Sequence, residues 1–181
     1  MTFNVTAFGG YSLDPDFSMT ETLHDPSTVV VDKLGRIFIS DTRHNRIVIL
    51  DKAGKLLNTI DNIDNPYGLA LYEGGSKLVL FFLEQDKDQL RSIVLPYTTS
   101  ELRTDELFEP SIALNMTFSD TENLLVDLFF DVTTKALYIT DAYAKVIYKQ
   151  IFTFDTSTAD FQFVEERNWI NGFINYQLGI D

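Results

Sequence analysis

The chain has 181 residues, 45% of them hydrophobic and 23% charged, a composition typical of a folded globular protein and not of a disordered chain. Its 27 acidic and 14 basic residues give a formal charge of −13, which disfavours binding to nucleic acid or anionic membrane surfaces. The sequence contains no cysteine, so disulfides and thiolate metal sites are excluded. Fifteen Phe and eight Tyr, together with many Val and Ile, favour sheet over helix.

The amino end, MTFNVTAFGG, carries neither the basic region nor the apolar core of a signal peptide. No apolar run reaches the roughly 18 residues that a membrane-spanning helix needs, so we expect no membrane span. Two triplets, Asn4-Val5-Thr6 and Asn115-Met116-Thr117, are candidate glycosylation sites that would suit a secreted protein. Secreted and cytoplasmic locations therefore both stay open.

The stretch from Asp25 to Ile60 predicts four antiparallel strands. Apolar and β-branched runs alternate with turn residues, and Gly35 and Gly54 stand where a tight hairpin needs a positive φ. One sheet of this size cannot bury both of its faces, so the sequence should contain more of them. The expected strands are Val29–Val31, Ile37–Ile39, Ile47–Leu50 and Leu56–Ile60.

Two further stretches repeat this pattern. The segment Gly68–Glu84 has the same rhythm of apolar run, turn and apolar run, with Gly74-Gly75 at the hairpin. The segment Leu128–Asp141 matches Val29–Asp41 in the order of its residue types. The aligned positions are Asp32, Tyr72 and Asp131 beside the hairpin, and Asp41, Phe82 and Asp141 at the second strand.

The spacing of these units predicts a β-propeller, because units near forty residues with four short strands are typical of propeller blades. Aligned positions lie 40 or 41 residues apart between the first two units and 59 apart between the next two. About 18 extra residues fall between Thr98 and Thr121, where Ser100–Leu107 fits a short helix. We expect an all-β propeller of four-stranded antiparallel blades, of an incomplete or partial six-bladed type. The expected units are 26–60, 66–118 and 123–166, with partial blades at Phe3–Gly10 and Phe173–Asp181.

The first unit resembles an NHL repeat. That pattern runs from Pro through an apolar run ending in Asp, a Gly turn, a strand ending in Asp-Thr, an Asn/His/Arg cluster and a strand before Asp-x-x-Gly. The third unit also resembles a blade of the Yellow and royal-jelly propeller family, and both resemblances imply a propeller fold. The residues that match the NHL pattern are Pro26, Val29–Asp32, Gly35, Ile37–Ile39, Asp41-Thr42, His44-Asn45-Arg46, Ile47–Leu50, Asp51 and Gly54.

Three complete units would leave two apolar blade faces without a neighbour, which is more than a soluble monomer normally exposes. Three arrangements would cover these faces. The chain is part of a longer six-bladed protein, or two copies join as half-propellers, or the propeller is small or irregular. The order of the chain does not separate them.

The loops between second and third strands, and those between blades, are expected on one face, where ligands and partners usually bind. Asp41 and Asp141 could ligate a cation there, since hard cations prefer oxygen ligands. An Asp in a turn more often accepts backbone hydrogen bonds, so we predict structural roles for both, and likewise for Asp32 and Asp131. The candidate binding residues are Arg43, His44, Tyr67, Gln85, Asp86, Tyr143 and Lys145.

The sequence supports two function classes. We favour a non-catalytic propeller scaffold that binds a protein or small ligand, or mediates assembly, because no reactive constellation stands out. His24 and His44 are the only histidines, and neither a serine nucleophile motif nor a phosphate-binding glycine loop occurs. The alternative is a hydrolase or lyase of the six-bladed propeller type, with a divalent cation such as calcium in the central channel.

Overall fold

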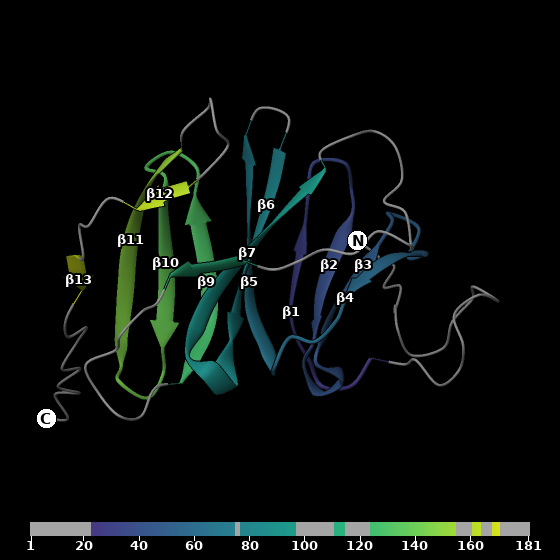
Figure 1. The fold of residues 1–181 in the computed structure, drawn as a ribbon, viewed down its shortest axis with the longest axis horizontal. Helices are drawn as coiled ribbons and strands as arrows, with labels where there is room; N and C mark the ends of the chain where they lie inside the picture. The colour runs from purple at the N-terminus through teal and green to yellow at the C-terminus, as the bar shows by residue number, and fades with distance from the viewer. Residues whose placement is uncertain are drawn as a thin grey trace, which may run out of the picture.

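The computed structural model describes residues 23–74, 77–96, 111–114, 124–154, 161–163 and 168–170. Within these ranges the chain forms three antiparallel sheets (Figure 1). Two short 3-10 helices, η1 (Thr42–His44) and η2 (Gln85–Lys87), are the only helices in this part of the chain. The predicted all-β fold is confirmed.

Each sheet is an antiparallel meander, and we call the sheets blades 1 to 3. Blade 1 has the order β1 (Pro26–Val31), β2 (Ile37–Asp41), β3 (Arg46–Leu50) and β4 (Leu56–Ile60). Blade 2 has the order β5 (Pro66–Gly74), β6 (Lys77–Glu84), β7 (Gln89–Pro96) and β8 (Ser111–Leu114). Blade 3 contains β9 (Leu125–Asp131), β10 (Ala136–Asp141) and β11 (Val146–Phe154), and β11 pairs with both β12 (Phe161–Phe163) and β13 (Asn168–Ile170).

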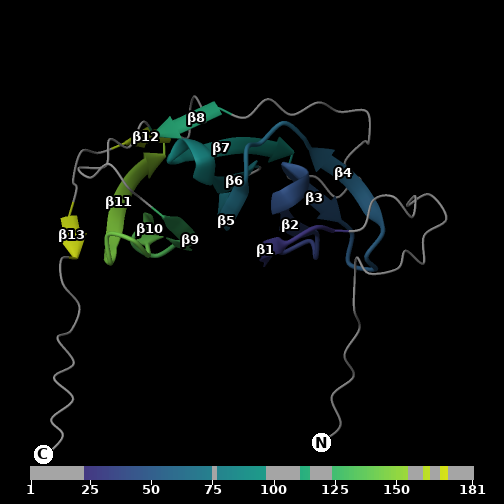
Figure 2. The same cartoon turned by 90° about the horizontal axis from the view of Figure 1, so that it is seen from below.

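The three blades stand side by side in an arc (Figure 2). The first strand of each blade, β1, β5 or β9, lies on the concave side, and β4, β8 and β12 lie on the convex side. Strand β5 contacts both β1 and β9, so neighbouring blades meet along their first strands. This is the arrangement of blades around a propeller axis.

Two apolar clusters fill the junctions between blades. At the junction of blades 1 and 2, Phe38 of β2 is fully buried with Phe82 of β6. At the junction of blades 2 and 3, the ring of Phe81 stacks on that of Phe130 with centroids 5.8 Å apart. Phe81 and Phe82 follow one another in β6, so alternation along the strand makes blade 2 apolar on both faces. A third cluster of Ile39, Val48 and Leu50 lies on the face of blade 1 that points away from blade 2.

Turn residues end the hairpins as the sequence predicts. Gly35 and Gly54 have φ of +82° and +87°, a conformation that residues with a Cβ rarely adopt. Asp32 Oδ1 accepts two backbone N–H groups of its own turn, at 2.9 and 2.8 Å, and Asp131 Oδ1 accepts one at 2.9 Å. These two carboxylates complete their turns, which is the structural role that the sequence predicts.

The register of β6 corrects the alignment of the second unit. Asp41 pairs with the first residue of β1, Asp141 with the first residue of β9, and Glu84, not Phe82, with the first residue of β5. Strands β5 and β6 have nine and eight residues, against six and five in β1 and β2. An alignment that counts residues from the hairpin therefore assigns the wrong equivalent positions in this unit. Tyr72 lies inside β5 rather than beside the turn.

Gly68 permits a close approach between blades 2 and 3. A Cβ at this position would lie 2.9 Å from the Cα of Asp127 and 3.0 Å from the backbone nitrogen of Leu128. Strand β5 bulges at the same place, because its register shifts between Tyr67 and Leu69. A side chain here would meet backbone atoms, so glycine allows the first strands of the two blades to pack together.

Several predicted features lie outside the described residues. These are the strands at Phe3–Gly10 and Phe173–Asp181, the short helix at Ser100–Leu107, and the candidate glycosylation sites Asn4 and Asn115. In the described part of the chain, no helix has the length and apolar character that crossing a membrane requires.

Candidate functional site

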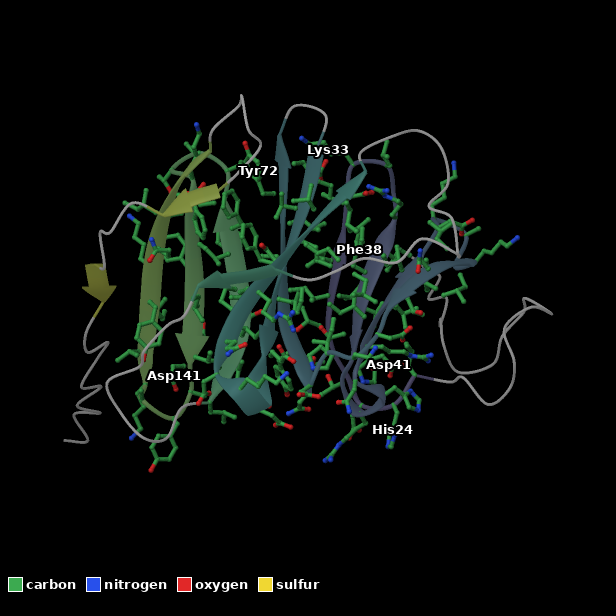
Figure 3. All side chains as sticks on the ribbon, viewed as in Figure 1. His24, Lys33, Phe38, Asp41, Tyr72 and Asp141 are labelled. Carbon is green, nitrogen blue, oxygen red and sulfur yellow. The ribbon has the colours of Figure 1, made fainter. Side chains whose placement is uncertain are left out.

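One edge of the arc collects the turns that the sequence singles out, and we call it the loop edge. Helix η1 connects β2 to β3, and η2 connects β6 to β7. Backbone hydrogen bonds place the segments that enter β1, β5 and β9 beside these turns. Figure 3 shows His24, Asp41 and Asp141 at this edge, with Lys33 and Tyr72 at the opposite one.

A buried carboxylate lies at the loop edge of each blade. Asp41, Glu84 and Asp141 are at most 1% exposed. Each accepts a backbone N–H from the segment that enters its blade, so the carboxylate ties the second strand to the start of the first. The three bonds run from His24 to Asp41 at 2.6 Å, from Asp64 to Glu84 at 2.9 Å, and from Leu124 to Asp141 at 3.2 Å.

In blade 1 a cation balances the charge of Asp41. Its Oδ2 accepts a hydrogen bond from Nε of Arg46 at 2.7 Å and lies 2.9 Å from Nδ1 of His44. The ring of His24 lies edge-on to that of His44, with centroids 5.3 Å apart. Both oxygens of this carboxylate are therefore engaged within blade 1, as its position in the turn predicts.

In blade 2 two cations surround Glu84. Lys87 Nζ lies 2.6 Å from Oε1, and Arg91 Nη1 lies 2.8 Å from Oε2. Burial raises the pKa of Glu84, but hydrogen bonds from Lys87, from the Asp64 N–H and from Arg91 outweigh it and lower the pKa below its usual 4.5. Lys87 also bridges to Asp64 at 2.8 Å, and hydrogen bonds to Asp64 and Glu84 raise the pKa of its ammonium group.

In blade 3 the carboxylate of Asp141 forms no ion pair with any described residue. Its Oδ1 accepts the N–H groups of Tyr143 at 3.0 Å and Ala144 at 2.9 Å. Its Oδ2 accepts the hydroxyl of Tyr148 at 3.3 Å. Neutral donors thus take the place that cations have in the other two blades.

A pocket of about 450 Å³ opens at the loop edge between blades 1 and 2. This volume lies within the range of about 300–1,000 Å³ that small-ligand sites occupy. Its walls come from both entry segments and from η1 and η2. The lining residues are Asp25, Pro26, Ser27, Thr42, Arg43, Asn65, Tyr67 and Gln85.

Hydrogen bonds between and within blades hold the pocket walls in place. The hydroxyl of Thr42 donates to the backbone oxygen of Pro66 at 2.8 Å, and Nδ2 of Asn65 donates to Oε1 of Gln85 at 3.0 Å. Gln85 Nε2 in turn donates to the backbone oxygen of Leu125, the first residue of blade 3, at 3.0 Å. The residue after the buried carboxylate therefore links blade 1 to blade 2 and blade 2 to blade 3.

Arg43 supplies a positive charge in the pocket. Its Nε donates to Oδ2 of Asp25 at 3.1 Å, and the two side chains are 67% and 68% exposed. An ion pair exposed to this extent contributes little to stability, typically at most about 1 kcal/mol. Both side chains can therefore turn to a molecule that enters the pocket at small energetic cost.

The structure brings three of the seven candidate binding residues, Arg43, Tyr67 and Gln85, into this pocket. His44 belongs to the same helix as Arg43, but its ring is paired with the buried carboxylate of blade 1. Asp86 follows Gln85 in η2, where it accepts a hydrogen bond at 3.0 Å from the entry segment of blade 2. These two residues support the pocket wall rather than line the pocket.

The other two candidates, Tyr143 and Lys145, lie in the turn of blade 3 at the same edge and do not line the pocket. Sequence reasoning missed several lining residues, although two of them carried a signal. Asp25 and Asn65 each precede a proline at the start of a blade, with φ of +51° and +50°. The missed residues are Asp25, Pro26, Ser27, Thr42 and Asn65.

The described residues contain no group of three or more His, Asp or Glu placed to hold a metal ion. Asp41 is engaged by Arg46 and His44, and Asp141 by backbone N–H groups and a hydroxyl.

Comparisons with known proteins give a family match and similar solved structures. Residues 23–50, which include β1, β2 and β3, match the NHL repeat. A search of curated proteins found no match. The solved structure of streptogramin B lyase is similar over 76% of this chain and 39% of that one, with 16% identity and a TM-score of 0.46. Kluyvelomyces marxianus Hsv2 is similar over 79% of this chain and 48% of that one, with 12% identity and a TM-score of 0.45, so the chain spans less than half of each.

Proposed function

We propose that this NHL-like propeller chain is a non-catalytic binding module that holds a polar segment of a protein, or a small polar ligand, between blades 1 and 2. The observation that carries the proposal is the pocket of about 450 Å³ at the loop edge, whose walls are joined by hydrogen bonds. Rigid blades that support loops at one edge are where ligand contacts usually lie. The fold alone names no chemistry, so the pocket residues must supply it.

The polar groups of the pocket favour a ligand with both hydrogen-bond donors and acceptors. Arg43 offers guanidinium donors, and Asp25 offers a carboxylate acceptor. A peptide backbone presents one N–H and one C=O per residue and meets this requirement. Binding of a polyanion such as nucleic acid is disfavoured, because the chain has a formal charge of −13.

The proposal is tested by recording backbone amide chemical shifts of the isotope-labelled chain while blocked tripeptides are added. The set contains acidic, basic, amide and apolar central residues. We expect saturable shifts at Arg43, Tyr67 and Gln85 for at least one polar tripeptide, and none at Tyr143, which lies at the loop edge outside the pocket.

Two matched variants separate the pocket from the rest of the loop edge. Arg43→Ala removes an exposed cation that lines the pocket, and Lys145→Ala removes an exposed cation from the blade 3 turn. Arg43→Ala is expected to weaken binding about tenfold or more, as loss of a charged hydrogen bond worth about 1.5–3 kcal/mol predicts. Shifts spread over all three blades, or equal loss in both variants, would contradict the pocket as the binding site.

A further inference from the structure

The pocket between blades 1 and 2 has two charged lining residues, Asp25 and Arg43, and their side chains are in contact. Nε of Arg43 donates to Oδ2 of Asp25 at 3.1 Å, and both side chains are exposed. Neither side chain forms another hydrogen bond or ion pair with a described residue. The terminal nitrogens of Arg43 and Oδ1 of Asp25 are therefore available to a ligand.

Hydrogen bonds hold the backbone that carries this ion pair. The N–H of Arg43 donates to the backbone oxygen of His24, the residue before Asp25, at 3.1 Å. The N–H of His24 donates to the buried carboxylate of Asp41 at 2.6 Å. An exposed ion pair contributes little to stability, so its two side chains can exchange partners while the backbone under them stays in place.

The neutral polar side chains of the pocket are already engaged within the chain. The hydroxyl of Thr42 donates to the backbone oxygen of Pro66 at 2.8 Å and lies 2.9 Å from the hydroxyl oxygen of Ser27. Nδ2 of Asn65 donates to Oε1 of Gln85 at 3.0 Å. A ligand that took over these groups would break bonds that join the pocket walls. The ion pair is therefore the part of the pocket that selects a ligand.

A ligand of this ion pair must match both of its charges. A carboxylate bound to Arg43 alone would lie beside the like charge of Asp25, in a chain whose formal charge is −13. An ammonium group bound to Asp25 alone would lie beside the like charge of Arg43. A ligand that carries both groups avoids both conflicts, because its carboxylate binds the terminal nitrogens of Arg43 and its ammonium group binds Oδ1 of Asp25. Such a ligand also adds no net charge.

The short distance within the ion pair determines how far apart the two charges of the ligand lie. The nitrogen of Arg43 and the oxygen of Asp25 are 3.1 Å apart, so the groups that bind these two side chains must be neighbours in the ligand. An α-amino acid carries its ammonium and carboxylate groups on the same carbon atom. A pocket of about 450 Å³ also leaves room for the side chain of such a ligand.

We infer that the pocket binds a free α-amino acid, with its carboxylate on Arg43 and its ammonium group on Asp25. The inference rests on the proposed function, since it names the ligand class of the same pocket. It favours the small ligand over the protein segment, because a peptide backbone inside a protein carries neither charge. Blocked tripeptides match at most one of the two charged residues and should bind more weakly.

The test records backbone amide chemical shifts of the isotope-labelled chain while free α-aminobutyrate, glutamine or phenylalanine is added. We expect saturable shifts at Arg43 and Gln85 for at least one of these amino acids, and none at Tyr143, which lies outside the pocket. N-acetylation removes the ammonium charge, and conversion to the amide removes the carboxylate charge. Each change should weaken binding about tenfold. The isomer γ-aminobutyrate keeps both charges at a wider spacing and should also bind about tenfold more weakly than α-aminobutyrate.

Two variants assign each charge of the ligand to its partner in the pocket. Asp25→Asn keeps the size of the side chain and a residue type that tolerates the φ of +51°, and N-acetylation should then no longer weaken binding. In Arg43→Gln, conversion of the carboxylate to the amide should no longer weaken binding. Lys145→Ala, a control outside the pocket, should keep both effects. Because the ion pair is exposed, circular dichroism of each variant should equal that of the unaltered chain.

The outcomes separate this inference from the proposed function. If blocked tripeptides shift the pocket residues and no free amino acid binds more tightly than they do, the inference is wrong and the proposed function stands. If neither kind of ligand shifts the pocket residues, both are wrong. Equal binding of the two aminobutyrates, or effects of ligand charge that persist in Asp25→Asn and Arg43→Gln, would also overturn the inference.

Discussion

The loop edges of blades 1 and 3 hold equivalent carboxylates in different ways. Asp41 and Asp141 end the second strands of their blades, both are buried, and both accept an N–H from the entry segment. Asp41 is paired with Arg46, whereas the described partners of Asp141 are backbone N–H groups and the hydroxyl of Tyr148. The position of the acceptor is the same, and the compensation of its charge is not.

This difference shows that each blade needs a carboxylate at this position but does not need a cation beside it. The entry segment must turn into the first strand, and a buried N–H left without a partner there costs about 1–3 kcal/mol. All three blades meet that need with a carboxylate at one register position. The cations occur in blades 1 and 2, which flank the pocket, so we expect charge removal to matter most there.

The largest expected effect comes from comparing Asp41→Asn with Asp141→Asn. Asparagine keeps an oxygen acceptor and removes the charge, which leaves Arg46, 13% exposed in its side chain, as an uncompensated buried cation. We expect Asp41→Asn to lower the free energy of unfolding by about 3–5 kcal/mol. Asp141→Asn leaves no cation without its counter-charge, so it is expected to lower the free energy of unfolding by only about 1–2 kcal/mol. Urea denaturation measures both losses of unfolding free energy. Equal losses would contradict the conclusion that Asp41 depends on its cation and Asp141 does not.

A double-mutant cycle assigns the next effect to the ion pair itself. Arg46→Met removes the cation and keeps much of its apolar volume, so the double variant with Asp41→Asn replaces the pair by neutral groups. The coupling free energy is expected to be about 2 kcal/mol, with the double variant more stable than the sum of the single losses predicts. Strictly additive losses in urea denaturation would show that Arg46 and Asp41 act independently.

The repeat of strands was readable from the sequence, but the carboxylate of blade 2 was not. Gly35 and Gly54 mark turns by their own chemistry, and local turn signals give strand order. Glu84 was missed because the longer hairpin of β5 and β6 displaces an alignment that counts from the turn. Its position depends on which residues pair across strands, and spacing alone does not fix that.

The residues of the candidate site were likewise only partly predictable from the sequence. Arg43 and Gln85 were predicted because they lie in turns between second and third strands, and Tyr67 because it lies in the loop that joins the first two blades; the structure places all three in the pocket lining. Thr42 matched the NHL pattern, but nothing in that match placed its side chain in a pocket, and Ser27 lies in strand β1, where a serine carries no signal of binding. That these residues share one pocket depends on blades 1 and 2 standing side by side, a contact between segments about forty residues apart.

The buried carboxylate of blade 2 is also paired with cations, and the pH dependence of stability tests its contribution. Hydrogen bonds from its cations and a backbone N–H lower the pKa of Glu84 against the effect of burial. Its contribution to stability is therefore present above the unfolded value of about 4.5 and is lost as pH falls through the lower folded value. Glu84→Gln is expected to be less stable than the unaltered chain at neutral pH, and this difference in the free energy of unfolding should narrow below pH 4.5. A gap in urea denaturation that stays constant with pH would contradict this assignment.

The smallest expected effect tests whether Tyr148 replaces a cation in blade 3. Its hydroxyl lies 3.3 Å from Oδ2 of Asp141, and Asp141 keeps three backbone N–H donors when that hydroxyl is removed. Tyr148→Phe should therefore lower the free energy of unfolding by only about 0.5–1 kcal/mol. A loss of unfolding free energy as large as that of Asp41→Asn would mean that one neutral hydroxyl stabilises Asp141 as much as Arg46 stabilises Asp41. The charge of the partner would then not distinguish the two blades.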